Sequence, residues 1–434
     1  MRTAQARVAP RVTGPAAPIG YGWEMKVAVF HPGTQHSWQT ATALQQLGRL
    51  AWYATSIFYK PDELPYRLER MLPRALATRV SAEFRRFQHL DLDPSLVRTS
   101  GIIEWLERIS TRGGARQLAK RLDTWGNARF ASQIARELRS PQPFALWGYN
   151  GSSLRAFTVA KQYGRRCILD RTNGDFRAYN RMMRQVADQY GEWFLPTELT
   201  HDHSQCDREY ALADAIVVGS PFAARTIREE AADPAIAAKL RVLNYCYDPR
   251  NFASLPAPRA SDRSQPVRFL FLGLVIPRKG IQHVLEAIER IPSRDAELTI
   301  VGDLKIPRKV FARFADRVTY LPTVPRSEVP RIMSEHHVLL LPSHFEGAGI
   351  VLYEALAAGC ALIQSRNCAE AVTPQTGMML NEISTDAVHQ AMLAAITDRA
   401  RLDAWRAAAP LAARAYTFDH YRDNIARLLA ELEI

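Results

Sequence analysis

Two glutamates, Glu346 and Glu354, are the side chains that the sequence best equips for chemistry. They begin and end the motif EGAGIVLYE, which follows an apolar run at 338–341 and opens a predicted helix that ends at Gly359. Glycines let a ligand approach the backbone closely, and the N–H groups at a helix start bind phosphate or hydroxyl oxygens. Because Glu354 has apolar neighbours, its carboxylate needs hydrogen-bond donors, and ribose hydroxyls are suitable. The structural alternative is that Glu346 caps the helix and Glu354 forms a salt bridge.

A second segment, FLGLVIPRKG at 271–280, places two cations where a diphosphate can bind. Its predicted strand ends at Gly273, and Arg278 and Lys279 stand at the start of the next predicted helix. In open α/β sheets ligands bind beside the carboxyl ends of the strands, and two cations at a helix N-terminus suit phosphate oxygens there. A glycine turn at Gly302 is expected at the same sheet edge.

These side chains must be positioned by an alternation of short apolar strands and helical stretches that begins at Met25. Such alternation favours parallel sheets that are covered by helices on both faces. With 434 residues, the chain is long enough for two or three domains. We predict an α/β protein with two Rossmann-like domains and a cleft between them. The predicted strands are 26–30, 144–147, 166–169, 215–218, 240–243, 267–272, 298–301, 318–321, 338–341 and 361–363.

The predicted domain boundaries follow changes in composition. Residues 1–24 are rich in Ala, Arg and Pro and lack apolar periodicity, so we expect a disordered leader that the fold does not need, with an organelle transit peptide as the alternative. A later stretch rich in Pro, Ser and Arg predicts an interdomain linker. The predicted units are an N-terminal domain at 25–248 with a helical insertion at about 60–139, the linker at 249–266, a C-terminal domain at 267–400, and helices at 401–434 that cross back to the first domain.

Composition excludes several classes of protein. Hydrophobic residues make up 47% of the chain and charged residues 23%, which is too apolar for a disordered chain. No apolar run approaches the roughly 20 residues that a membrane-spanning helix needs. The five cysteines are scattered and never spaced as C-x-x-C, which disfavours a disulfide framework or a structural zinc site and favours a reducing cytoplasm. The net charge of +12 indicates an anionic partner, such as nucleic acid, an acidic membrane surface or a phosphorylated small molecule.

Two other clusters leave alternatives open. The basic stretch from about Pro65 to Leu90, in which arginines are interleaved with apolar residues, predicts either a helix that docks on an anionic membrane surface or a packing helix with a solvated basic face. His201, His203 and Cys206 crowd together, but their spacing is not a recognised metal-ligand pattern, so we assign no metal.

Taken together, these motifs resemble the retaining glycosyltransferases of family four, which have the two-domain GT-B fold. The resemblance is carried by the paired glutamates with seven residues between them, the Ala-Leu-Ala-Ala-Gly that ends at Gly359, the Lys279-Gly280 pair and their order along the chain. It covers residues 205–380 well and residues 25–205 more loosely. One departure is Leu274, which stands where the family often has an arginine, so Arg278 is the candidate to supply that charge.

Carried over residue by residue, the resemblance implies a donor site on the second domain. Lys279, with Arg278 and Gly273, would bind the donor diphosphate, and Glu354 would bind the nucleotide ribose. Glu346 would contact the donor sugar and serve as a catalytic residue. The remaining implied contacts of this domain are the amides of Gly347, Ala348 and Gly349 to the sugar and Val324 near the base.

On the first domain, the resemblance implies two further contacts. The loop HPGTQHS, which contains Gly33, would face the donor phosphates and the acceptor. Asp170 and Asn173 lie where the family often has a sugar-contacting histidine. Both are therefore candidates for contact with the sugar, and Asp170 is the candidate catalytic group of this domain.

The implied function is transfer of a sugar from a nucleotide-diphosphate sugar to a saccharide or lipid-linked acceptor, with retention of the anomeric configuration, as in polysaccharide biosynthesis. The donor is a substrate, and no cofactor or metal is expected. The enzyme would work in the cytoplasm, at the inner face of the membrane if the basic stretch docks there. One alternative is a sugar-nucleotide epimerase or hydrolase with the same fold, which needs no acceptor. Another is a nucleic-acid-binding protein, which the net charge alone favours because no nucleic-acid module is recognisable.

Overall fold

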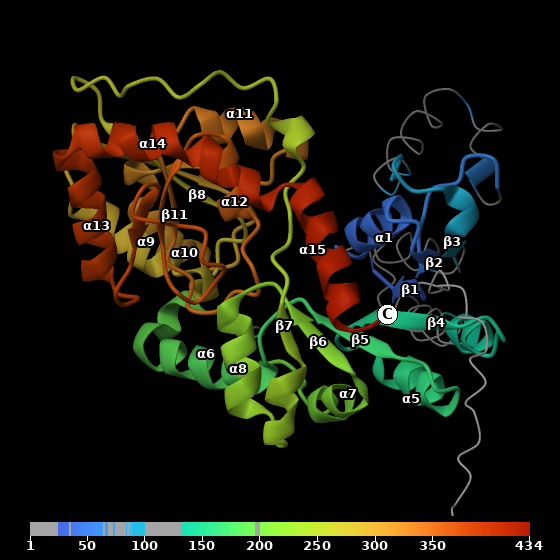
Figure 1. Ribbon diagram of the computed structural model, residues 1–434. Helices are drawn as coiled ribbons and strands as arrows, with labels where there is room; N and C mark the ends of the chain where they lie inside the picture. The colour runs from blue at the N-terminus through green and yellow to red at the C-terminus, as the bar shows by residue number, and fades with distance from the viewer. Residues whose placement is uncertain are drawn as a thin grey trace, which may run out of the picture.

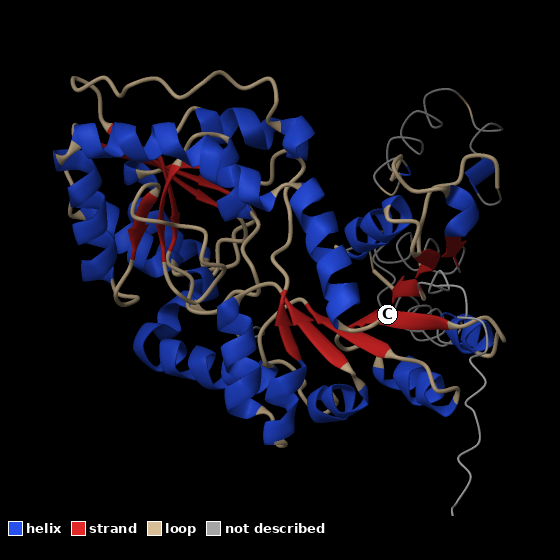
Figure 2. Ribbon diagram, viewed as in Figure 1, coloured by secondary structure: helices blue, strands red, loops and turns tan. Residues whose placement is uncertain are grey.

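The protein consists of two parallel-sheet domains that are joined by a linker and by the last helix of the chain (Figure 1). The computed structural model describes residues 25–33, 36–63, 66–67, 73, 84, 87, 89–99, 130, 132–195 and 200–434. Helices cover both faces of each sheet (Figure 2). The predicted architecture of two Rossmann-like α/β domains is therefore confirmed. Among the helices of the described residues, none is long and apolar enough to cross a membrane.

The N-terminal sheet has seven parallel strands in the order β3-β2-β1-β4-β5-β6-β7. Its central strands read as continuous apolar runs because helices bury both of their faces. The strands are β1 (Lys26–His31), β2 (Leu50–Thr55), β3 (Val97–Thr99), β4 (Phe144–Tyr149), β5 (Cys167–Arg171), β6 (Ala215–Val218) and β7 (Leu240–Val242). The helices of this domain are α1 (Ser37–Gln46), α5 (Leu154–Gln162), α6 (Phe176–Tyr190), α7 (Cys206–Leu212) and α8 (Pro221–Glu230).

The C-terminal sheet has six parallel strands in the order β10-β9-β8-β11-β12-β13. Its strands are β8 (Val267–Leu272), β9 (Ala296–Val301), β10 (Thr319–Leu321), β11 (Val338–Leu341), β12 (Ala361–Gln364) and β13 (Gly377–Met379). Its helices are α9 (Ile281–Glu289), α10 (Arg308–Phe311), α11 (Val329–Ser334), α12 (Val351–Ala357), α13 (Thr385–Thr397) and α14 (Arg399–Ala413), and α15 (Phe418–Glu431) ends the chain. Every strand that the sequence predicted is present.

Three strands are absent from the sequence prediction. The run LAWYAT of β2 is short and apolar, and periodicity alone cannot separate such a run from a buried helix segment. β3 (VRT) and β13 (GMM) are short and do not form an apolar run that marks a strand in the sequence. Because β3 pairs with β2, part of the segment predicted as an insertion at 60–139 is the edge strand of the sheet. The predicted helices of that segment, and the basic stretch from Pro65 to Leu90, fall largely outside the described residues.

The chain crosses between the domains twice. The linker first passes over the second domain, where the Ser261 N–H donates to Asp403 Oδ1 of α14 at 2.8 Å (Figure 1). α14 belongs to the core of the second domain through Leu402 and Trp405, so of the helices predicted to cross back, only α15 reaches the first domain.

α15 completes the core of the N-terminal domain beside α1. Its residues Tyr421, Ile425 and Leu429 lie in the same hydrophobic cluster as Val27 of β1. Tyr421 Oη also lies 2.8 Å from Thr40 Oγ1 of α1. The last helix is therefore part of the first domain in space, although it follows the second domain in sequence.

Replacing Ile425 by Ala should destabilise the protein. Its side chain is 0% exposed, and deleting a buried side chain of this size costs about 2–5 kcal/mol because a cavity remains. Urea unfolding at pH 7 would measure the loss. Arg427→Ala, on the exposed face of the same helix, is the matched control, and its effect should stay within about 0.5 kcal/mol. Equal effects of the two variants would contradict the assignment of α15 to this core.

Candidate functional site

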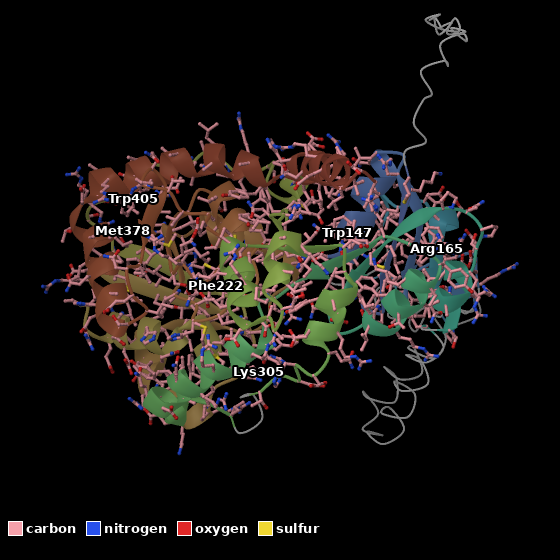
Figure 3. The ribbon with its side chains drawn as sticks, turned by 60° about the horizontal axis from the view of Figure 1, so that its bottom comes forward. Trp147, Arg165, Phe222, Lys305, Met378 and Trp405 are labelled. Atoms are coloured by element: carbon pink, nitrogen blue, oxygen red, sulfur yellow. The ribbon has the colours of Figure 1, made fainter. Side chains whose placement is uncertain are left out.

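The candidate site lies between the domains, where the loops after β1 and β5 face the loops after β8 and β11. Gly347 brings the two domains together, because its carbonyl accepts a hydrogen bond from Ser220 Oγ at 2.5 Å. A Cβ atom at position 347 would lie 1.9 Å from Thr172 O, so only glycine allows this approach. Phe222 of α8 lies at the same junction, with its ring centroid 5.2 Å from that of Phe345 (Figure 3).

The charged centre of the site is Glu346, which lies between Arg278 and Lys279. Its Oε2 atom is 2.8 Å from Lys279 Nζ and 3.0 Å from Arg278 Nη1. Burial disfavours the carboxylate, but the charges and hydrogen bonds of the two cations outweigh it and lower the pKa of Glu346 to about 2. Glu346 is therefore ionised at neutral pH, and two cations against one carboxylate leave an excess of positive charge.

A left-handed glycine holds this centre in place. Lys279 ends a single 3₁₀ turn after β8, and Gly280 follows with a φ of 75°, a conformation that favours glycine. A Cβ atom at Gly280 would lie 2.2 Å from Pro342 O, so the glycine also lets the loop after β8 pack on the loop after β11. The His344 N–H then donates to Arg278 O at 2.8 Å, which joins the two loops that carry the charged side chains.

Two cavities of about 340 Å³ each open beside this centre, a size that suits small-molecule ligands. Cavity A is lined by His36, Thr172, Asn173, Tyr245, Leu272, Gly273, Lys279, Glu346, Ala348, Gly349, Ile350 and Val351. Cavity B is lined by His36, Asn251, Phe252, Leu272, Val324, Arg326, Val329, Pro330, Ile350 and Glu354. The structure thus brings most of the sequence-predicted residues of the second domain to two adjoining cavities.

Glu354 lies in the first turn of α12, at the wall of cavity B. Its Oε1 atom is 3.2 Å from Arg326 Nη2, and the Arg326 side chain is 76% exposed. Burial raises the pKa of Glu354, and the charge of Arg326 partly opposes this rise. The salt bridge of the structural alternative is therefore present, although the carboxylate also faces the cavity. Glu346 is not a helix cap, because α12 begins at Val351 and has no side-chain cap.

Asp170 does not reach the cleft, contrary to the role expected from the sequence. It is fully buried at the end of β5, where its Oδ1 accepts from Tyr245 Oη at 2.7 Å and its Oδ2 accepts from Trp147 Nε1 at 3.2 Å. Burial raises the pKa of Asp170 to about 6. Because Tyr245 lines cavity A, the structure makes Asp170 a positioning residue for Tyr245.

His36 is a site residue that the sequence analysis did not single out. It lines both cavities, and its ring centroid lies 4.6 Å from that of Tyr245. Burial lowers the pKa of His36 to about 4, so the ring is neutral at pH 7. Gly33 of the same loop lines neither cavity, and its N–H donates to His31 Nδ1 at 2.9 Å. The sequence feature that could have identified His36 is its position directly before the start of α1.

A third cavity of about 390 Å³, cavity C, lies on the other side of Arg278. Its lining comes from both domains and comprises Asn173, Phe176, Tyr179, Thr200, His201, Leu274, Ile276, Arg278 and Phe345. Asn173 lines cavities A and C, and the ion pair of Arg278 with Glu346 separates them. Within the described part of the chain, no group of three or more His, Cys, Asp or Glu side chains could hold a metal ion.

Comparison of the sequence with known proteins finds a family match within the second domain. Residues 266–398 match the family described as glycosyl transferases group 1. The uncharacterized glycosyltransferase YqgM of Bacillus subtilis is 26% identical over 185 residues, which are 38% of this chain and 47% of YqgM. The lipopolysaccharide glucosyltransferase WaaG of Escherichia coli is 32% identical over 113 residues, which are 24% of this chain and 30% of WaaG. The chain thus spans less than half the length of these relatives.

Solved structures extend the likeness to the whole fold. Sucrose-phosphate synthase from Thermosynechococcus elongatus aligns with a TM-score of 0.61 at 16% identity, over 94% of this chain and 99% of that chain. The lipopolysaccharide outer core galactosyltransferase WaaB aligns with a TM-score of 0.60 at 13% identity, over 94% of this chain and 100% of that chain. Anabaena HepE in complex with UDP and glucose aligns with a TM-score of 0.58 at 12% identity, over 94% of this chain and 100% of that chain. These likenesses show that the fold is GT-B.

Replacing Asp170 by Asn should change how stability depends on pH. The pKa of Asp170 is about 6 in the folded protein and about 3.9 in an unfolded chain, so the wild type loses stability as the pH rises from about 4 to 6. Asn keeps the size without this titration. The stability of the variant relative to the wild type should therefore rise by up to about 3 kcal/mol between pH 4 and pH 7.

Urea unfolding at stepped pH would measure this difference. Asp303→Asn, which changes an exposed carboxylate of the second domain, is the matched control and should show no such rise. If the stability difference between the variant and the wild type stays constant from pH 4 to pH 7, Asp170 does not bind a proton with the expected pKa.

Proposed function

We propose that the protein is a glycosyltransferase that uses a nucleotide-diphosphate sugar as its donor. The observation that carries this proposal is the Glu346 carboxylate between Arg278 and Lys279 at the wall of cavity A. This centre lies within the segment that matches the glycosyl transferases group 1 family. Its excess positive charge suits a diphosphate, and its carboxylate suits the hydroxyls of a sugar.

The donor would occupy cavities A and B together. The sugar and the diphosphate lie in cavity A, beside Glu346 and Lys279, and the nucleoside lies in cavity B, with its ribose on Glu354 and its base near Val324. His36 lies where the two cavities meet. As a neutral imidazole, it can donate one hydrogen bond to a phosphate or ribose oxygen at this junction.

The reaction requires little covalent chemistry from the protein. The acceptor oxygen bonds to the anomeric carbon as the bond to the diphosphate breaks, and the acceptor proton passes to the leaving diphosphate. Negative charge builds on the diphosphate in this step. Lys279 at the wall of cavity A, with Arg278 behind it, stabilises this charge because Glu346 already holds both side chains in place. We infer retention of configuration from the resemblance of the paired-glutamate motif to the retaining enzymes.

Two features support transfer over the alternative of an epimerase or hydrolase with the same fold. Cavity C adjoins cavity A, which gives an acceptor room beside the donor sugar. Two of the similar proteins, the glucosyltransferase WaaG and the galactosyltransferase WaaB, are named as lipopolysaccharide enzymes, and on this basis we propose a saccharide or lipid-linked acceptor. The five cysteines are buried and unpaired, which suits a cytoplasmic location.

A thermal-shift screen across UDP-, GDP- and ADP-sugars tests the donor proposal. A ligand that binds only the folded protein stabilises it by mass action, by about 2.7 kcal/mol at one hundred times its Kd. We expect one nucleotide class to raise the melting temperature with saturable dose dependence. Absence of a shift with all three classes would contradict a nucleotide-sugar donor.

Lys279→Ala should weaken the binding of the nucleoside diphosphate by about 1.5–3 kcal/mol, which is the contribution of a charge-assisted hydrogen bond to phosphate. Calorimetry with the nucleoside diphosphate identified in the screen measures this loss. Lys309→Ala removes an exposed lysine of the same domain and should leave the affinity unchanged. An unaltered affinity of the Lys279 variant would remove the phosphate assignment.

Glu354→Gln and Glu346→Gln should fail differently. Ribose is held alike in the ground and transition states, so Glu354→Gln should mainly raise the donor KM. The sugar changes charge and shape as its bond breaks, so Glu346→Gln should mainly lower kcat, by about 10²-fold or more. Steady-state kinetics, with proton NMR of the product anomer, would decide this. A normal kcat for the Glu346 variant, or an inverted product, would overturn the mechanism but leave donor binding intact.

A further inference from the structure

We propose that cavity C is the acceptor subsite and that it selects a sugar with an anionic substituent, such as a carboxylate or a phosphate. This inference rests on the proposed glycosyltransferase function and adds the chemical class of the acceptor. Three features of the cavity carry it, namely its place beside the donor sugar, its aromatic lining and its charge.

The place of cavity C suits the second substrate. It lies between α6 of the first domain and the loop after β8 of the second, so both domains contribute to it. Asn173 faces cavities A and C, and Arg278 lines cavity C while it binds Glu346 of cavity A. A single side chain would therefore separate a ligand in cavity C from the sugar expected in cavity A.

The lining of cavity C has the composition of a sugar site. Rings of Phe176, Tyr179, His201 and Phe345 pack against one another, with centroids 4.7 Å apart for Phe176 and His201 and 5.3 Å apart for Tyr179 and Phe345. Such an aromatic cluster offers apolar surface to the C–H groups of a sugar ring. The amide of Asn173 and the hydroxyl of Thr200 can bind its hydroxyl groups.

The charge of cavity C favours an anion. None of its described lining residues is acidic, and Arg278 supplies a guanidinium group. Arg278 uses Nη1 for its bonds to Phe345 O and Glu346 Oε2, and its other nitrogens have no hydrogen-bond partner among the described residues. A bidentate bond from Arg278 to a carboxylate or phosphate is therefore available.

The test compares glucuronate and glucose 6-phosphate with glucose. Each is titrated by ligand-observed NMR against the full chain, with saturating amounts of the nucleoside diphosphate from the screen. Both anions should bind at least about tenfold more tightly than glucose, the effect expected of one charge-assisted hydrogen bond, and added salt should reduce the difference. If both anionic sugars bind more tightly than glucose, negative charge determines the selectivity of cavity C. If only one of them does, that sugar shows whether the cavity selects a carboxylate or a phosphate.

His201→Glu places a negative charge at the rim of cavity C and should abolish this preference. His203→Glu, two residues away and also exposed, is the matched control and should keep it. The melting temperature of each variant checks that it is folded. Equal affinity for glucose and the anions, or equal behaviour of the two variants, would overturn the inference.

Loss of anionic-sugar binding when the intact nucleotide sugar replaces the nucleoside diphosphate would place the bound sugar in the donor-sugar subsite and would also overturn the inference. Binding of the nucleoside diphosphate is measured first and separately. Its absence would contradict the proposed function, whereas its presence without a preference for anionic sugars would contradict only the acceptor class.

Discussion

The ion cluster of Glu346, Lys279 and Arg278 is the interaction on which the rest of the site depends. Three nearly buried charges are tolerated only because each has an opposite charge within hydrogen-bond distance, and loss of one would leave the others uncompensated. The cluster also fixes the loops after β8 and β11 against each other. Because cations outnumber carboxylates, these loops keep positive charge between cavities A and C, where a leaving diphosphate would need it.

The domains meet through backbone contacts that leave no room for side chains. Gly347 lies against Thr172 of the first domain, which brings the domains together. Within the second domain, Gly280 lies against Pro342, so that the two charged loops pack closely on each other. α15 returns to the first domain and buries its apolar face beside α1. Packing therefore sets the spacing of the elements that bound the cleft. This spacing in turn determines the size of cavities A, B and C.

The two domains contribute different chemistry to the site. The second domain supplies the ionised groups, and the first supplies neutral ones, His36 and Tyr245 among them. Their neutrality has a structural cause, since burial lowers the pKa of His36 and raises that of Tyr245 well above its usual value. Asp170 lies behind Tyr245 and holds its hydroxyl, so this carboxylate acts on the cleft through a second side chain. The described residues of the first domain that line cavities A and B are therefore uncharged at neutral pH.

The sequence by itself determined the two α/β domains, most strands, and the placement of Glu346, Gly273 and Lys279 at one sheet edge, because apolar periodicity and glycine positions are local properties. Only the tertiary structure decided that Glu346 pairs with both cations, that Asp170 is buried and that His36, instead of Gly33, is the residue of the loop after β1 that lines the cavities. Those outcomes depend on which distant segments meet and on how much water they exclude. Neither can be predicted from the residues that are adjacent in sequence.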